Sequence, residues 1–138
     1  MSIADTNSII RSYLTTSSAK VDPLITLVGA RIYCPRLPEN TPLPAISFFT
    51  RGGTSTPYIP GIPSPSVQFD CWADNPIDAR EVYRALYDAL QGIQNIAKGT
   101  TQGILSAIEE VQGQDLVDIE IPNYFRVLTF FSIMIRAE

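Results

Sequence analysis

The residue types that most often carry catalysis or bind metals are scarce in this chain. It contains no histidine, and its two cysteines, Cys34 and Cys71, lie far apart in the sequence. Cysteine and histidine form most protein zinc sites, and a nucleophilic serine or cysteine needs a nearby base. The sequence therefore excludes the usual Cys/His zinc sites and any Cys–His or Ser–His pair. We expect both cysteines to be buried thiols outside any disulfide.

Carboxylates are the remaining candidates for chemistry, and their spacing does not favour it. Glu109 and Glu110 are adjacent, so on a strand they point to opposite faces and cannot act as a carboxylate pair. Asp70 lies within an apolar stretch, where an unpaired carboxylate is costly. We therefore expect a structural ion pair between Asp70 and an arginine, with Arg84 and Arg126 as the candidates.

Phosphate-binding loops have a recognisable spacing that this chain lacks. The segments RGGTST and KGTTQG contain glycine and hydroxyl side chains, but neither has the spacing or the strand-to-helix setting of such a loop. With no site left that could do chemistry, we expect no enzyme activity, no cofactor and no metal.

Charge is sparse and unevenly distributed. Charged residues make up 17% of the chain, below the figure of about a quarter for soluble domains, which suggests that other chains cover part of the surface. The net charge is −4 and the ten basic residues are scattered, which argues against a protein that grips nucleic acid through its phosphates. One acidic segment contains no base and holds Glu109, Glu110, Asp115, Asp118 and Glu120.

Length and the N-terminal sequence limit the organisation of the protein. A chain of 138 residues is long enough for one domain and too short for two ordinary ones, so we expect a single domain at 1–138. The start, MSIADTNSII, lacks the basic and apolar regions of a signal peptide, and no apolar run reaches the roughly 18 residues that a membrane helix needs. We expect a protein that is made and kept in a cytoplasm, with no membrane contact.

The clearest local pattern is a strand followed by a helix at 66–92. The odd positions from 67 to 73 are apolar, the period of two that marks a strand with one buried face. Asn75 is placed to cap a helix, Pro76 suits its first position, and Gly92 is placed to end it. The apolar stripe of this helix, which must pack on the sheet, consists of Ala79, Val82, Tyr83, Leu86 and Leu90.

The rest of the chain supplies short helices and further strands. We expect a helix at 5–14, a short turn or helix at 22–28, a short strand or extended piece at 31–34, a turn region at 93–103, and strands at 45–50 and 124–136. Residues 104–111 could form a helix or a strand, and we favour a strand because Gly103 and Gly113 bound the segment. The segment 124–136 is apolar at both odd and even positions, which favours a central strand whose second face is covered by a helix or a neighbouring subunit. The pattern predicts an α+β fold: a mostly antiparallel sheet of about four strands with one main helix packed on it and short N-terminal helices.

Two segments between the strands are candidates for contacts with other molecules. Residues 51–65 are rich in proline and glycine and too long for a tight hairpin, so we expect a flexible arm there. This arm is either a plain connection or a segment that docks on a neighbouring subunit through Tyr58, Ile59 and Ile62. Residues 112–123 are expected to form an acidic loop.

Two motifs in fixed order, RIYCPRLPENTPLPAISF and VQFDCWADNPIDAREVYRALYDAL, precede an apolar last strand that follows an acidic loop. In this order and spacing they resemble the tail-completion proteins of long-tailed phages, also called tail terminators or tail-to-head joining proteins. The resemblance covers nearly the whole chain. The matching positions are Arg31, Ile32, Tyr33, Leu37, Pro38, Pro44, Ala45, Ile46, Val67, Gln68, Asp70, Cys71, Trp72 and Ala73. The sequence departs from the family pattern at Cys34 and in the arm YIPGIPSPS.

The resemblance implies a virion structural protein that forms a ring, commonly a hexamer, on the end of the tail tube. Such a ring stops tube growth and joins the tail to the head, so the implied partners are the tail tube protein and a head connector or neck protein. The protein would be assembled in the host cytoplasm and kept at the tail–head neck of the virion. DNA passes through the ring without specific binding, and an acidic lumen would suit this passage. We place the five acids at 109–120 in that lumen as a hypothesis.

An alternative function uses the same architecture without a ring. A non-enzymatic module could bind a protein or peptide along an exposed edge of the sheet. A small-molecule enzyme is the third possibility, and we rank it last because histidine is absent and no polar cluster converges.

Overall fold

The computed structural model describes residues 6–34, 42–54, 64–98, 102–117 and 125–136. Within these ranges the chain forms three helices and six strands, which confirms the predicted α+β class. The helices are α1 (Thr6–Thr15), α2 (Asp22–Val28) and α3 (Pro76–Leu90). The strands are β1 (Ile32–Tyr33), β2 (Ala45–Thr54), β3 (Ser64–Ala73), β4 (Gln94–Lys98), β5 (Gln102–Val117) and β6 (Phe125–Arg136).

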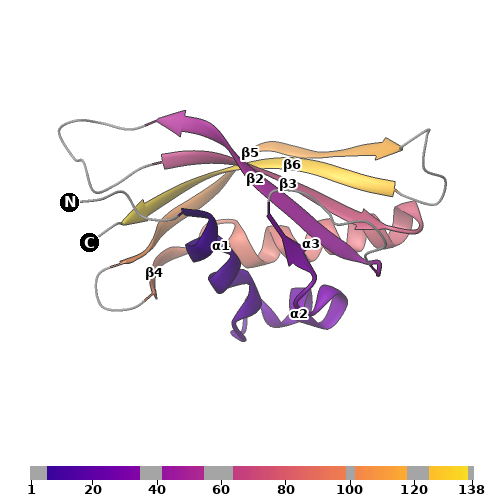
Figure 1. The fold of residues 1–138 in the computed structure, drawn as a ribbon, viewed down its shortest axis with the longest axis horizontal. Helices are drawn as coiled ribbons and strands as arrows, with labels where there is room; N and C mark the ends of the chain where they lie inside the picture. Colours follow the sequence, from indigo (N-terminus) through magenta and orange to yellow (C-terminus); the bar gives the residue numbers. More distant parts are fainter. Residues whose placement is uncertain (1–5, 35–41, 55–63, 99–101, 118–124, 137–138) are drawn as a thin grey trace.

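The strands form one sheet in the order β1-β2-β3-β6-β5-β4. β1 is parallel to β2, and all other neighbours are antiparallel. β3 and β6 occupy the centre, as the apolar character of the last strand predicted. The helices lie together on one side of this sheet, so the fold has two layers (Figure 1).

Alternation along the two central strands builds the core. Val67 is paired with Phe131, and Cys71 with Val127, on the face that the helices cover. Phe69 lies between these rows and contacts two other aromatic rings: Phe48 is stacked at a centroid distance of 5.6 Å, and Phe131 meets it edge-on at 5.7 Å. All of these side chains are buried, and aromatic packing of this kind supplies much of the hydrophobic stabilisation in a small domain.

Helix α3 begins and ends as its sequence indicates. The Asn75 side chain accepts a hydrogen bond from the Asp78 backbone N–H at 2.8 Å, and Pro76 occupies the first turn. The helix ends at Leu90, and Gly92 then takes a φ of 77°, which costs glycine little. The predicted apolar stripe is buried and faces the sheet, where α3 contacts β3, β5 and β6.

Helices α1 and α2 pack beside α3 at the end of the sheet that carries β1. The Tyr13 hydroxyl donates a hydrogen bond to the Ala89 carbonyl oxygen at 2.6 Å, which ties α1 to the last turn of α3. Arg11 Nε donates to the Ile32 carbonyl oxygen at 2.9 Å and so ties α1 to β1. Among the described residues, no helix is both long and apolar enough to cross a membrane.

The sheet is larger than the sequence predicted, because three segments expected to be loops are strands. Residues 94–98, predicted as a turn region, form β4 and pair with the start of β5. β2 continues through 51–54 and β3 begins at Ser64, so only part of the predicted arm at 51–65 lies outside these strands. Likewise β5 includes 112–117 of the predicted acidic loop. Residues 55–63 and 118–124 lie outside the described residues.

Pairing across the sheet explains these corrections. The register between β2 and β3 shifts between Thr50 and Gly53, and Gly52 takes a φ of 97° there, so a bulge carries the strand past polar, glycine-rich sequence. β5 has three register shifts against β6, which let it stay paired although its residues do not alternate strictly. Such pairing depends on a partner strand, so the propensity of one segment taken alone does not reveal it.

Parts of the sheet edges are short or covered, whereas the outer edge of β2 beyond Ser47 has no partner strand among the described residues. β1 has two residues. β4 pairs with β5 as far as Ser106, and beyond that point the end of α3 covers the outer edge of β5. The Gly92 N–H donates to the Ala107 carbonyl oxygen at 2.9 Å, and the Glu109 N–H donates to Gln91 Oε1 at 2.7 Å. Bulges and covered backbone groups of this kind protect an edge from pairing with another strand.

Gly113 provides a test of how tightly β5 packs on α3. A Cβ atom at this position would lie 2.8 Å from both Tyr83 Cζ and Val127 Cγ1. We predict that Gly113→Ala lowers the free energy of unfolding by about 1–3 kcal/mol, measured by urea denaturation, because the added methyl group has no room beside Tyr83 and Val127. Val127→Ala in the same chain should recover part of the loss. Equal stability of Gly113→Ala and wild type would contradict this packing.

Candidate functional site: the open face of the sheet

The sheet face opposite the helices is the candidate functional surface, and we call it the open face. α3 packs on β3, β5 and β6 from one side, and no described element packs on the other side (Figure 1). Because side chains alternate along a strand, the residues between the buried core positions point to this face. They comprise Ser47 and Phe49 of β2, Ser66, Gln68, Asp70 and Trp72 of β3, and Arg126, Leu128, Phe130, Ser132 and Met134 of β6.

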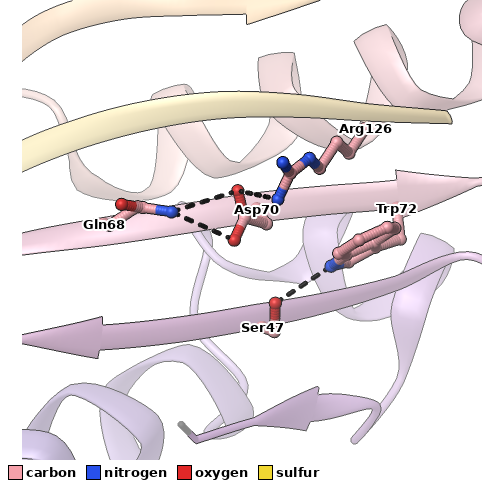
Figure 2. A network of polar contacts seen from close by, with 5 residues as sticks. All are labelled: Ser47, Gln68, Asp70, Trp72 and Arg126. Atoms are coloured by element: carbon pink, nitrogen blue, oxygen red, sulfur yellow. Dashed lines mark hydrogen bonds and ion pairs between the residues drawn. The ribbon is translucent and has the colours of Figure 1, made fainter. Parts of the chain in front are cut away.

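A polar row crosses the centre of the open face (Figure 2). Arg126 Nη1 lies 3.6 Å from Asp70 Oδ1, and Gln68 Nε2 donates to the two oxygens of Asp70 at 3.5 and 3.3 Å. The Arg126 guanidinium also lies over the Trp72 ring, 5.3 Å from its centroid. Trp72 Nε1 in turn donates to Ser47 Oγ at 2.9 Å. The row therefore links β2, β3 and β6 and fixes the orientation of its two largest side chains.

Of the two arginines proposed as partners of Asp70, the structure brings Arg126 to it. Arg126 follows from the register, because β6 pairs with β3 so that Arg126 lies opposite Trp72, two residues along the strand from Asp70 and on the same face. Arg84 is exposed on α3, on the far side of the sheet from Asp70. There it lines a hollow of about 330 Å³ together with Pro76, Ile77, Arg80 and Glu81.

Asp70 is buried although it lies on the face that no helix covers. Its relative exposure is 5%, because neighbouring side chains of the polar row surround it. Burial raises the pKa of the Asp70 carboxyl, and the charge of Arg126 and the hydrogen bond from Gln68 lower it by less. The ionised carboxylate is therefore less favourable in the folded chain than in the unfolded chain.

Large apolar side chains gather beside the polar row, over β5 and β6. Ile108, Val111 and Met134 are 58%, 37% and 39% exposed, and Leu128 and Phe130 are half-buried. The register places them as neighbours, because Val111 pairs with Phe130 and Ile108 pairs with Ser132, which lies between Phe130 and Met134 on the open face of β6. Leu128 is the next residue of β6 on that face. We call these five residues the open-face patch. A contiguous apolar patch on a surface is typical of a protein interaction site.

Glu109 and Glu110, the two predicted lumen acids whose side chains are described, do not lie on one surface. Glu109 points to the helix side, where Tyr83 Oη and Thr129 Oγ1 each donate to its Oε2, at 2.7 and 2.8 Å. Glu110 lies on the open face, where it accepts a hydrogen bond from Ser66 Oγ at 2.7 Å. The two acids therefore lie on opposite faces of the sheet, because adjacent residues of a strand point to opposite faces, and the placement of the five acids in a lumen stays a prediction.

The remaining predicted site residues are only partly described. The backbone of Asp115 belongs to β5, where it pairs with Val127. Asp118 and Glu120 lie outside the described residues, as do Tyr58, Ile59 and Ile62 of the predicted arm.

Tyr83 anchors the helix side of the same region. Its hydroxyl donates to Glu109 and accepts from the Gly113 N–H at 3.1 Å, while the Arg80 guanidinium lies 5.3 Å from its ring centroid. Burial, followed by the hydrogen bond to Glu109, raises the pKa of Tyr83 to about 12, so the hydroxyl keeps its proton and can donate at neutral pH. The arrangement is structural, because it holds the bulged part of β5 against α3.

The described residues offer little for catalysis or metal binding. They contain no group of three or more histidine, cysteine or acidic side chains that could hold a metal ion. Every buried polar side-chain atom among them has a hydrogen-bond partner. Cys71 is buried, and burial raises the pKa of its thiol, so it stays protonated and unreactive. Cys34 is exposed, which corrects the expectation that both thiols are buried: it follows the last residue of β1 and leaves the sheet.

A search of solved structures found this arrangement of helices and strands elsewhere. The chain superposes with a TM-score of 0.61 on a chain of a structure described as "Virion of native gene transfer agent (GTA) particle". The protein shares its fold with a virion component. The match covers 94% of this chain and 92% of that one at 14% identity, a likeness that establishes the fold alone. A scan against protein-family models found no match, and neither did a search of curated proteins.

Sequence reasoning missed most of the open-face patch. The even positions of β6 were recognised as a second apolar face, but Ile108 and Val111 of β5 were not singled out. Their exposure depends on the register shifts of β5, which change the face that successive residues take. A signal was present, because each apolar residue lies next to a glutamate in the stretch IEEV, where a buried strand would have placed fewer charges.

The raised pKa of Asp70 gives a pH-dependent prediction. Between the unfolded value of 3.8 and the higher folded value, the Asp70 carboxyl binds more protons in the folded chain, so the contribution of Asp70 to wild-type stability falls as pH rises through this window. The amide of the Asp70→Asn variant does not titrate. As pH rises through the window, the free energy of unfolding of Asp70→Asn minus that of wild type should therefore increase by about 1.4 kcal/mol for each unit by which the pKa is raised. Above the window this difference should stay constant.

Thermal unfolding of both proteins from about pH 3 to about pH 8, which spans the window, measures this difference. If Asp70→Asn instead lost stability relative to wild type as pH rose, the ion pair with Arg126 would outweigh burial.

The hydroxyl of Tyr83 gives a second prediction with a matched control. Tyr83→Phe leaves the Gly113 N–H without its acceptor and removes one donor to Glu109, so we expect a loss of about 1–2 kcal/mol in the free energy of unfolding. Tyr87, one helical turn later, is 37% exposed, and Tyr87→Phe should change stability little. Urea denaturation compares the two variants, and equal effects would refute a structural role for the Tyr83 hydroxyl.

Proposed function

We propose that this protein is a structural component of a phage-type virion, and that it acts as a ring on the end of the tail tube. The observation that carries the proposal is the likeness in fold, over nearly the full length of both chains, to a chain of a gene transfer agent virion. The motif resemblance to tail-completion proteins supports the finer role, in which the ring stops tube growth and joins the tail to the head. This role requires no enzyme activity.

The open face supports assembly with other protein chains. Its patch exposes large apolar side chains that a solitary soluble protein would not need, and the chain has few charges to keep its surface in water. In the proposed role the partners are further copies of the chain, the tail tube protein and a head connector or neck protein. The ring, commonly a hexamer in the family it resembles, would be assembled in the host cytoplasm and reside at the neck of the virion.

We retain the proposed acidic lumen, but with fewer of the acidic residues. Glu109 is engaged by Tyr83 and Thr129 beneath α3, so it is not available to line a channel on the open-face side. The proposal keeps Glu110, Asp118 and Glu120 as candidates for the lumen, where negative charge would let DNA pass without binding. Asp115 pairs with Val127, in the row of β6 that faces the helices, so it is excluded together with Glu109.

The alternative function, peptide binding along a sheet edge, has less support. β-strand addition needs a row of unpaired backbone groups at an edge. Here one edge strand has two residues, and the end of α3 covers part of the outer edge of β5. The face of the sheet is therefore the better candidate for binding than its edge.

The proposed ring is tested directly by mass and by microscopy. We expect native mass measurement of the purified protein, alone or mixed with tail tubes, to find a closed oligomer, and electron microscopy to find rings at tube ends. Tubes assembled with the protein should stop lengthening. A monomer that binds no tube under any condition would rule out the proposed role and leave the peptide-binding module as the better explanation.

The arm provides a mutational test of subunit or tail-tube contacts. Replacing Tyr58, Ile59 and Ile62 together with serine removes apolar area that would be buried at an interface, so association should weaken by about 100-fold or more while the melting temperature of the subunit stays unchanged. A matched control, Ile77→Ser with Tyr87→Ser, removes exposed apolar side chains from α3 and should leave association unchanged. Unaltered assembly of the arm variant would refute its docking role.

A further inference from the structure

The open-face patch is an exposed apolar area, and pairing between sheet edges would not bury it. Single exposed apolar residues are common on protein surfaces, but Ile108, Val111 and Met134 adjoin the half-buried Leu128 and Phe130 in one contiguous area. Edge pairing between copies is hindered by the bulges of β2 and β5 and by the hydrogen bonds that join β5 to Gln91 and Gly92. Pairing at an edge would also leave the patch uncovered, so a partner that buries the patch has to approach the face.

We propose that the open-face patch receives segment 55–63 of a neighbouring copy of the chain. This inference rests on the proposed ring, and it identifies the surface on which the arm docks. The segment, STPYIPGIP, carries no charge and contains Tyr58, Ile59 and Ile62, so its burial on the patch would leave no charge unpaired.

The prolines of the segment favour docking on a face. Pro57, Pro60 and Pro63 recur at every third residue and have no backbone N–H, so the segment is poorly suited to adding a strand to an edge. Proline-rich segments instead bind apolar, aromatic surfaces through their side chains. Phe130 provides an aromatic ring at the centre of the patch. Arg51, two residues after Phe49 on β2, lies over that ring, with its Cζ atom 4.8 Å from the ring centroid.

The place where the segment leaves the sheet favours a neighbour over its own subunit. Its flanking residues Thr54 and Ser64 pair with each other, so both ends leave the sheet at one point. Ser66, two residues after Ser64, lies in one row across the sheet with Ser132 and Ile108. The patch of the same subunit therefore lies on the sheet close to the point where the segment leaves it. Because both ends are anchored side by side, the nine residues between them must form a loop, and the middle of such a loop can project beyond the end of its own sheet to a neighbouring copy.

One arm and one patch per copy satisfy the geometry of a ring. An arm that docks on a different surface of the next copy makes a heterologous contact, and such contacts close into rings when the rotation between copies allows it. Each subunit then donates one arm and receives one, so every patch is covered in a closed ring.

Disulfide trapping in the full-length chain tests this contact. In a Cys34→Ser background, which removes the exposed native thiol, Ile59→Cys and Ile108→Cys are made in separate chains and mixed under mild oxidation. We expect a covalent dimer in the mixture and none with Ile59→Cys paired with Ile77→Cys, since Ile77 is 73% exposed but lies on α3. Ile108→Ser should also weaken association by about tenfold, and Ile77→Ser should not.

The outcomes separate this inference from the proposed ring. Rings that form without the covalent dimer overturn the inference and leave the ring standing. A disulfide found only within a chain that carries both cysteines overturns it as well, because the arm would then bind its own patch. A covalent dimer in open chains or filaments supports the docking contact and contradicts the ring. A protein that stays monomeric and untrapped at high concentration overturns both.

Discussion

The antiparallel pairing of β3 with β6, with one face of the pair buried beneath α3, is the constraint on which the rest of the structure depends. Val67, Phe69 and Cys71 share that buried face with Val127 and Phe131, and the aromatic rings among them interlock. Because strand side chains alternate, burying these residues sends their neighbours to the opposite face. The composition of the open face is thus a direct consequence of how the core is built.

The polar row gives the open face a defined shape at a cost in stability. The ionised Asp70 carboxylate is 5% exposed, and burial raises its pKa in spite of Arg126 and Gln68. A group that destabilises the isolated chain at neutral pH is not explained by folding alone. The polar row instead fixes the orientation of its side chains. Arg126 forms an ion pair with Asp70 and lies over the Trp72 ring, and Trp72 donates a hydrogen bond to Ser47. A surface with fixed side chains loses less entropy when a partner binds.

The two faces of the sheet divide the roles of the chain. The helix side holds the buried contacts that keep β5 against α3, including the Tyr83–Glu109 hydrogen bond and the close approach of Gly113. The open face holds the open-face patch and two exposed charged residues, Arg51 and Glu110. Glu109 and Glu110 illustrate the division, because one residue along the strand separates a structural acid from a surface acid. A subunit of the proposed ring would have to be stable alone and bind other chains in the assembly, and this division of the two faces would serve both needs.

The sequence by itself determined the elements whose signals are local. Asn75, Pro76 and the apolar stripe define α3, alternation defines the covered face of β3, and the doubly apolar β6 indicates a central strand. It also determined that adjacent glutamates diverge and that Asp70 needs an arginine. Only the tertiary structure decided that Arg126 is this arginine, that β4 exists, that β2 and β5 extend through bulges, and that Ile108 and Val111 are exposed. The physical reason is the same in each case: caps and alternation can be read within one segment, whereas pairing and register also depend on the partner strand.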